Sequence, residues 1–369
     1  MSTPAESSTS NPTTPGRPEV HQPQIYSDPR VQLVLLQQLS EIGLDRIREP
    51  KSLATLPLQP SNIDLAVLMA EIEMGFESLY EALPNELVSD QFEIETARED
   101  RVINGGNKVH IYRPGLSTAP LPCVVYFHGG GMSTLSTVNK VHDRWARSLA
   151  AAGVVVVMVD FRNAYTAAAY LPYPAGLSDC ASAVHWLYYN REALNIGNIV
   201  LQGEGGGANL AMATALKANR EAWAYKIDGV YAIAPFISNA YSWPLSAKQS
   251  HLPSLVECHG YLLSVSVLRH MASFYTPNPQ DQTQPLAWPY YASLADMSGL
   301  CPHTIVVDEL DPLRDEGIAY GRKLAKAGVD VLTRMNIGTV HAASVMFRKA
   351  LPNLHRSTIS DIAAFARRV

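Results

Sequence analysis

The chemistry of this sequence centres on a glycine-rich turn, Gly203-Glu204-Gly205-Gly206-Gly207. Apolar residues of a short strand, Val200 and Leu201, precede the turn, and a helical stretch begins near Ala208. A strand, a tight turn and a helix with the pattern Gly-x-Ser-x-Gly form an elbow that presents a nucleophilic serine above a sheet. Here Gly205 occupies the serine position, so the elbow lacks a nucleophilic oxygen.

Two other roles of glycine-rich turns fit this one less well. A phosphate-binding loop ends in Gly-Lys-Ser or Gly-Lys-Thr, whereas this run ends in Gly207-Ala208-Asn209. The dinucleotide-binding pattern Gly-x-Gly-x-x-Gly also fails, because Ala208 stands at its last position. The turn therefore indicates a hydrolase elbow rather than a nucleotide site.

A second glycine run, His128-Gly129-Gly130-Gly131, directly follows the apolar residues 124–127. Successive glycines let the backbone approach a ligand closely and turn its N–H groups toward it. Such N–H groups stabilise the negative oxygen that develops during acyl transfer. A tight turn alone requires only one or two glycines, so the run predicts a loop that binds an oxyanion.

An acid and a base follow in the order expected for this chemistry. Asp311 comes after a predicted strand, where a carboxylate can hold an imidazole, and Asp308 and Glu309 are competing acids. Helix N-capping is the alternative role for Asp311, although Asp315 is better placed for it. His341 follows the next strand, about thirty residues later, in the nucleophile, acid, histidine order of α/β hydrolases.

Composition excludes several other classes of function. The chain has 369 residues and a net charge of −5 without a basic stripe, so nucleic acids and anionic membranes are unexpected partners. No run of about eighteen apolar residues occurs, which predicts the absence of a membrane span. The N-terminus lacks the apolar region of a secretory signal, so a cytoplasmic location is expected.

Cysteines and histidines show no pattern of a metal or cofactor site. The four cysteines are far apart and form no CxxC pair, and we expect them to be buried thiols. The histidines and carboxylates lack the spacing of metal ligands. We therefore expect neither a metal nor another cofactor.

The chain divides into three predicted parts. Residues 1–24 are rich in serine, threonine and proline, which indicates a flexible arm that either packs on a partner subunit of a homodimer or stays disordered. Residues 25–90 carry helical apolar spacing and predict a helical cap over the site. Residues 91–369 form the main domain, with a further cap insertion at about 235–289.

Apolar periodicity predicts alternating strands and helices in the main domain. Strands are expected at 92–95, 109–114, 124–127, 154–159, 199–202, 230–234, 304–307 and 329–335. Helices are expected at 29–44, 63–80, 138–151, 179–189, 209–218, 262–274, 315–326 and from about 360 onward. This alternation predicts an α/β fold with a mostly parallel sheet and helices on both faces.

These motifs together resemble the hormone-sensitive-lipase-like family of α/β hydrolases, from about residue 109 to the C-terminus. The matching segments are 128–131, the stretch that runs from 160–162 to 174–180, and the segments 207–211 and 311–317. The resemblance implies a capped α/β-hydrolase fold and hydrolysis of a carboxylic ester, with a small-molecule ester as the substrate. It also implies that Asp311 is the triad acid and that His341 is the base. The family's oxyanion donors correspond to the backbone N–H groups of Gly130, Gly131 and Gly206.

The sequence departs from the family pattern at three places. Met132 replaces an aromatic residue and Ala342-Ala343 replaces Gly-Phe, which predicts a roomier pocket. Gly205 replaces the serine, and glycine has no side chain that could attack a carbonyl.

Three hypotheses accommodate Gly205. The first is an ester hydrolase whose nucleophile has been replaced, as in a variant engineered to trap a bound substrate. The second is a natural small-molecule receptor, like the plant gibberellin receptors on the same fold, and the third is a lyase or cyclase that uses His341 as its base. We favour the first, because Asp311, His341 and the oxyanion glycines all remain in family position.

Overall fold

The computed structural model describes residues 24–84, 97–103, 106–115, 117 and 119–369. The N-terminal arm, apart from residue 24, and the predicted strand at 92–95 therefore lie outside the described residues.

An eight-stranded sheet forms the centre of the described chain, in the strand order β1-β2-β4-β3-β5-β6-β7-β8. The strands are β1 Ala97–Val102, β2 Lys108–Arg113, β3 Leu121–Phe127, β4 Val155–Asp160, β5 Ile196–Glu204, β6 Gly229–Ile233, β7 His303–Asp308 and β8 Val331–Asn336. β2 runs antiparallel to β1 and to β4, whereas all pairs from β4 to β8 are parallel. The predicted mostly parallel α/β sheet is confirmed.

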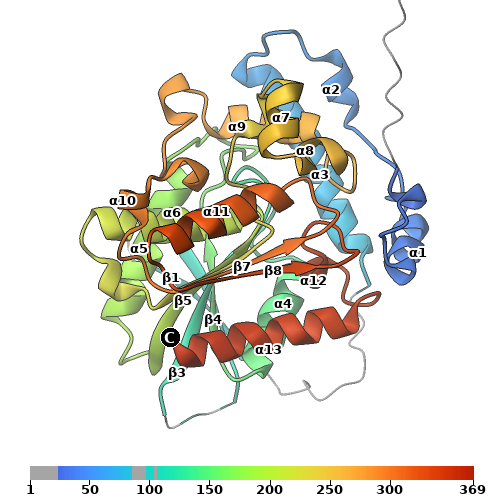
Figure 1. Ribbon diagram of the computed structural model, residues 1–369. Helices are drawn as coiled ribbons and strands as arrows, with labels where there is room; N and C mark the ends of the chain where they lie inside the picture. The colour runs from blue at the N-terminus through green and yellow to red at the C-terminus, as the bar shows by residue number, and fades with distance from the viewer. Residues whose placement is uncertain (1–23, 85–96, 104–105, 116, 118) are drawn as a thin grey trace, which may run out of the picture.

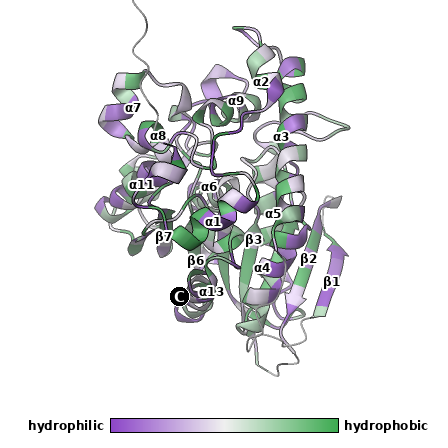
Figure 2. Ribbon diagram, turned by 90° about the vertical axis from the view of Figure 1, so that its right-hand side faces the viewer, coloured by the Kyte–Doolittle hydropathy of each residue, from purple (hydrophilic) through white to green (hydrophobic). Residues whose placement is uncertain are grey.

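Alternate residues of the central strands pack into two separate hydrophobic clusters, one on each face of the sheet. Val125 and Phe127 of β3 belong to one cluster, and Val124 and Tyr126 belong to the other. Because both faces are covered, these strands are apolar throughout rather than alternating, as Figure 2 shows by their green colour. The two edge strands differ, because all residues of β1 are exposed and most of them are charged, and no residue of β8 is buried.

Helices cover both faces of the sheet (Figure 1). One face is covered by α4 Lys140–Ala151 and α13 Pro352–Arg368. The other is covered by α5 Ala175–Tyr189, α6 Gly206–Arg220 and α11 Arg314–Lys326. α13 begins at Pro352 rather than near residue 360, because a proline fits the first turn of a helix, where its missing N–H is not needed.

The cap consists of helices from two separate parts of the chain. The N-terminal part contributes α2 Lys51–Thr55 and α3 Asn62–Ala82, and the insertion contributes α7 Leu245–His251, α8 Ser254–Glu257 and α9 Val265–Tyr275. These helices gather at one end of the sheet in Figure 1. The short helices α10 Leu294–Met297 and α12 Ala343–Met346 complete the described fold.

Helix α3 is the longest cap helix, and its start is encoded locally. The side chain of Ser61 accepts a hydrogen bond from the backbone N–H of Asp64, whose carboxylate accepts one from the backbone of Ser61. This reciprocal capping box satisfies N–H groups that a helix start leaves free. One face of α3 is buried through Leu65, Leu68 and Met69.

Helix α1, Leu33–Glu41, lies on the flank of the main domain rather than over the site. The backbone N–H of Gln32 donates to the carbonyl of Gly338 at 3.1 Å. The side chain of Gln38 accepts from the backbone N–H of Ala350 at 3.2 Å. Of the two predicted N-terminal helices, α3 alone contributes residues to the active-site pocket among the residues described.

Candidate active site

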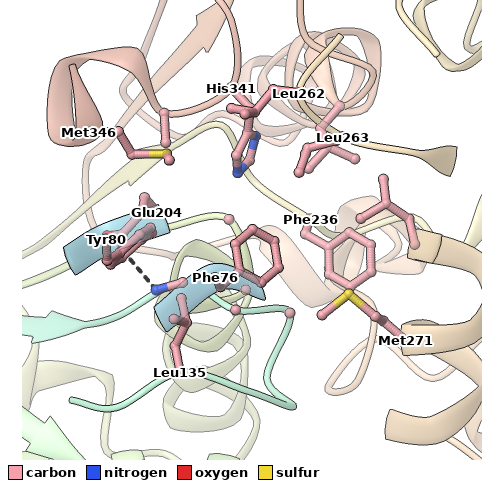
Figure 3. Close-up of a pocket in the computed structure, with 18 residues that line it drawn as sticks. Phe76, Tyr80, Leu135, Glu204, Phe236, Leu262, Leu263, Met271, His341 and Met346 are labelled. Carbon is pink, nitrogen blue, oxygen red and sulfur yellow. Dashed lines mark hydrogen bonds between the residues drawn. The ribbon is translucent and has the colours of Figure 1, made fainter. Parts of the chain in front are cut away.

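The predicted site residues come together at the carboxyl ends of the strands. The His128–Gly131 loop follows β3, Gly205 follows β5, and Asp311 follows β7. His341 lies in the loop after β8, above the elbow (Figure 3). Carboxyl ends of parallel strands meet at one edge of a sheet, which is why residues far apart in sequence meet here.

Gly205 stands at the turn between β5 and α6 with φ +53° and ψ −115°. Residues with a side chain rarely adopt this conformation, whereas glycine adopts it readily. A Cβ atom added at Gly205 would lie 3.2 Å from Nε2 of His341. A side chain at position 205 would therefore point directly at the imidazole of His341.

His341 is held by Asp311. Nδ1 of His341 lies 2.8 Å from Oδ2 of the fully buried Asp311 carboxylate. The other oxygen of Asp311 accepts the backbone N–H of Leu313 at 2.9 Å. With Nδ1–H donating to Asp311, Nε2 is the ring nitrogen left to accept a proton from the position above Gly205.

Burial lowers the pKa of His341, but the neighbouring carboxylates, with Asp311 foremost, together outweigh burial and raise the pKa above its ordinary value of 6.5. Asp308 and Glu204 add smaller contributions in the same direction. Charged carboxylates stabilise the imidazolium form, which is the form that a base reaches after taking a proton.

The two competing acids have other partners. Asp308 accepts hydrogen bonds from Asn336 at 2.9 Å and from the hydroxyl of Thr339 at 2.7 Å. Burial raises its pKa to about 6. Glu309 accepts the backbone N–H of Gly338 at 2.7 Å. Asp311 is thus the acid that contacts His341.

The glycines predicted to bind an oxyanion border the same space. Gly130, Gly131 and Gly206 all line the pocket, and within the described chain the N–H groups of Gly130 and Gly131 donate to no other residue. A Cβ on Gly206 would lie 2.5 Å from the backbone nitrogen of Met132 and 2.7 Å from Cα of Gly131. Only glycine allows the start of α6 to approach the loop this closely.

Glu204 is a site residue that the sequence analysis did not single out. Its carboxylate accepts the backbone N–H of Gly129 at 2.7 Å and the hydroxyl of Tyr126 at 2.9 Å. Its other oxygen, Oε2, has no hydrogen-bond partner among the described residues. Burial raises the pKa of Glu204 to about 7. The sequence feature that could have identified Glu204 is its position between two glycines at the end of a buried strand.

The pocket is small and mainly apolar, with a cavity volume of about 50 Å³. Phe76 and Tyr80 of α3 cover it from one side, and Met271 of α9 covers it from the other (Figure 3). Leu268 of α9 also lines the pocket. Cap side chains and Met346 line the space beside His341, and the roomier pocket expected from Met132 and Ala342-Ala343 stays a prediction. Several of the lining residues come from the cap, so the motifs of the main domain alone do not identify them.

Within the described ranges, no group of three or more histidine, cysteine, aspartate or glutamate residues is arranged to hold a metal ion. In the same ranges, no helix has the length and hydrophobicity that crossing a membrane requires.

Known proteins resemble the chain in sequence. A family model described as the alpha/beta hydrolase fold matches residues 124–345. Carboxylesterase NlhH from Mycobacterium tuberculosis is 32% identical over 265 residues, which cover 70% of this chain and 77% of that protein. Ethyl acetate hydrolase from Pseudomonas putida is 31% identical over 241 residues, which cover 63% of this chain and 70% of that protein.

Solved structures resemble the chain over almost its whole length. A brefeldin A esterase, described as a bacterial homologue of human hormone-sensitive lipase, is 42% identical with a TM-score of 0.89. The match covers 96% of this chain and 98% of that chain. Esterase Est22 is 33% identical with a TM-score of 0.79, over 94% of this chain and 100% of that chain. The chain therefore belongs to the hormone-sensitive-lipase-like family of α/β hydrolases.

Proposed function

We propose that this chain binds small carboxylic esters in the pocket beside His341 and hydrolyses them only when residue 205 supplies a hydroxyl. One observation carries the proposal: the side-chain position of Gly205 points at Nε2 of His341, with 3.2 Å between a Cβ placed there and the nitrogen. A serine oxygen is one bond beyond Cβ, so it could reach hydrogen-bond distance of the imidazole.

The surrounding residues supply the other steps of acyl transfer. His341 would take the proton of the attacking hydroxyl and later give it to the departing alcohol, while Asp311 holds the imidazole in place. The N–H groups of Gly130, Gly131 and Gly206 would stabilise the negative oxygen of the tetrahedral intermediate. Water would then attack the acyl group on residue 205, with His341 again acting as the base.

With Gly205 in place, no covalent intermediate can form on residue 205. Removal of a triad member leaves a residual rate, supplied by the oxyanion hole and by binding, that is lower by several orders of magnitude. The chain as given should therefore bind an ester and release it almost unchanged. This behaviour is expected of a hydrolase whose nucleophile has been exchanged to trap substrate.

Short acyl groups are the proposed substrates, because the cavity at the site is about 50 Å³ in volume. The similarity to an ethyl acetate hydrolase supports this choice. Brefeldin A is added to the substrate panel to test this size limit, because the structure with 42% identity is an esterase named for it.

The test compares Gly205→Ser with Gly205→Ala on p-nitrophenyl acetate and butyrate. We expect the serine variant to release p-nitrophenol at least about 1,000-fold faster than the alanine variant, which retains only the binding and oxyanion groups. A rapid initial burst would indicate slow deacylation of an acyl-enzyme. If a folded, ester-binding serine variant is as inactive as the alanine variant on the whole panel, the hydrolase proposal fails and a receptor or lyase role replaces it.

A further inference from the structure

A second cavity, of about 650 Å³, lies in the cap on the other side of α9 from the active-site pocket. Leu268 and Met271 of α9 line the active-site pocket, whereas Val265 and Arg269 of the same helix line the second cavity. Most of the remaining wall comes from α2, α7 and α8, which lie beside α9 in Figure 1, and from the residues next to them. The volume lies within the range of roughly 300–1,000 Å³ that small-molecule sites occupy.

Basic side chains dominate the charge of this cap cavity. Its basic lining residues are Lys51, Lys248, His259, Arg269 and His270, and among the described lining residues Glu49 is the only acid. Glu49 is itself engaged, because its carboxylate accepts a hydrogen bond from the hydroxyl of Ser264. The cavity therefore carries an excess of positive charge.

The cations on α7 and α9 lack protein counterions. In the part of the chain that the structure describes, no carboxylate lies within ion-pair distance of Lys248 or Arg269. Burial lowers the pKa of Lys248, and the nearby Arg269 guanidinium lowers it further. Lys248 is half-buried and Arg269 is exposed, so both charges are accessible to a ligand from solvent. Like charges that line one cavity repel each other, and a bound anion would relieve this repulsion.

His259 offers a neutral hydrogen-bond donor to the same cavity. Its Nδ1 accepts the backbone N–H of Val265 at 3.0 Å, so the neutral ring carries its proton on Nε2. His270 has the opposite arrangement, because its Nδ1 lies 2.8 Å from the carbonyl of Ser266 and donates to it. Nε2 of His270 therefore donates only when that ring is protonated.

Apolar side chains lie beside the cations. Leu53 of α2, Leu245 of α7, and Leu255 and Val256 of α8 also line the cavity. Such a mixture suits a ligand with a charged head and an apolar body, since each part finds a matching surface. We infer that the cap cavity binds a small organic anion, a carboxylate or phosphate monoester with a short apolar body, between Lys248 and Arg269.

Calorimetric titration of the chain as it stands, with Gly205, tests this inference. The probes are hexanoate, hexyl phosphate and the matched neutral compound hexanamide. At least one of the two anions should bind with a dissociation constant of about 1 mM or lower, and at least about tenfold more tightly than hexanamide. The tighter of the two anions identifies the preferred head group.

Variants distinguish the cap cavity from other sites. Lys248→Ala and Arg269→Ala should each weaken binding of the tighter anion about tenfold, because each removes one of the unpaired charges. Lys349→Ala, on an exposed residue outside the cavity, is the matched control and should leave binding unchanged. Circular dichroism melts of each variant establish that it is folded.

Binding at the active site is the main competing outcome. If His341→Ala abolishes anion binding while Lys248→Ala and Arg269→Ala leave it intact, the anion occupies the active-site pocket and the inference is overturned. Equal binding of hexanamide, or no heat of binding up to about 20 mM of either anion, overturns it as well. None of these results depends on whether Gly205→Ser restores hydrolysis.

Discussion

The carboxylate of Glu204 accepts the backbone N–H of Gly129 at 2.7 Å, which ties the residue before the nucleophile position to the oxyanion loop. The same oxygen accepts the hydroxyl of Tyr126, so the ends of β3 and β5 are joined through one buried side chain. Because Glu204 is fully enclosed, burial raises its pKa to about 7. The charge of this carboxyl therefore changes within the neutral pH range, next to the site.

Glu204 should make stability fall as pH rises. Its pKa is near 4.5 in an unfolded chain and about 7 in the folded one, so between these values the folded state binds more protons. The free energy of unfolding then decreases across this range, by roughly 3 kcal/mol at most from this group. Urea denaturation at pH 5 and pH 8 should show a smaller decrease for Glu204→Gln than for the parent chain.

Glu41→Gln on the exposed surface of α1 is the control and should preserve the parent's dependence on pH. Asp308 and Glu316, whose pKa values burial raises to about 6 and about 7, contribute in the same direction and remain in both variants. If the free energy of unfolding of Glu204→Gln depends on pH as in the parent chain, the Glu204 carboxyl has the same pKa in the folded and unfolded states.

The pH dependence of hydrolysis should report the ionisation of His341. In the Gly205→Ser background, kcat/KM should rise with pH and level off, because only the neutral imidazole accepts a proton. The midpoint should lie above 6.5, because Asp311, Asp308 and Glu204 together raise the pKa of His341 more than burial lowers it. Glu204→Gln in this background should shift the midpoint to lower pH, since the Glu204 carboxylate also favours the imidazolium.

His341→Ala in the Gly205→Ser background should lower kcat by several orders of magnitude without unfolding the protein. The imidazole is the only group in the described pocket placed to take a proton from the position above Gly205. Stopped assays on p-nitrophenyl butyrate measure the loss, and His251→Ala on the exposed end of α7 is the control. Full activity in His341→Ala would remove the histidine from the mechanism.

The central sheet was predictable because its strands are buried on both faces. Residues 124–127 and 154–159 are continuous apolar runs, and the structure contains β3 and β4 at these places. β1 was missed because it is exposed at the edge of the sheet and mostly charged, so no apolar pattern identifies it. The short helices α2, α7 and α8 were missed as well, since about two turns or fewer of periodicity are too few to recognise.

The site was predictable only where chemistry requires a particular residue type. The glycine runs, Asp311 and His341 follow strands in a fixed order, which a sequence motif captures. Phe76 and Met271 line the pocket because α3 and α9 fold over it, and no local pattern encodes that approach. The role of Glu204 depends on its distance from Gly129, which is 75 residues away in sequence.

The backbone of Gly205 predicts that a side chain at this position lowers stability. Gly205→Ser and Gly205→Ala should each lower the free energy of unfolding by about 1–3 kcal/mol, because φ +53° with ψ −115° is strained for any residue with a Cβ. Urea denaturation at constant pH measures the loss. Gly75→Ala is the control: it lies within α3 with no atom within 4 Å of the new Cβ, and it should be neutral or stabilising.

The last prediction concerns the size of the acyl group. Met346 borders the 50 Å³ cavity beside His341, so Met346→Ala should enlarge it toward longer acyl chains. In the Gly205→Ser background, the ratio of kcat/KM for p-nitrophenyl hexanoate to that for the acetate should rise about tenfold, the discrimination that one or two methylene groups produce. Met74→Ala is the matched control, because Met74 is 64% exposed on α3, and it should leave the ratio unchanged. A folded Met346→Ala variant with the parent's ratio would show that another side chain limits the acyl group, and Phe76→Leu would then be the variant to measure.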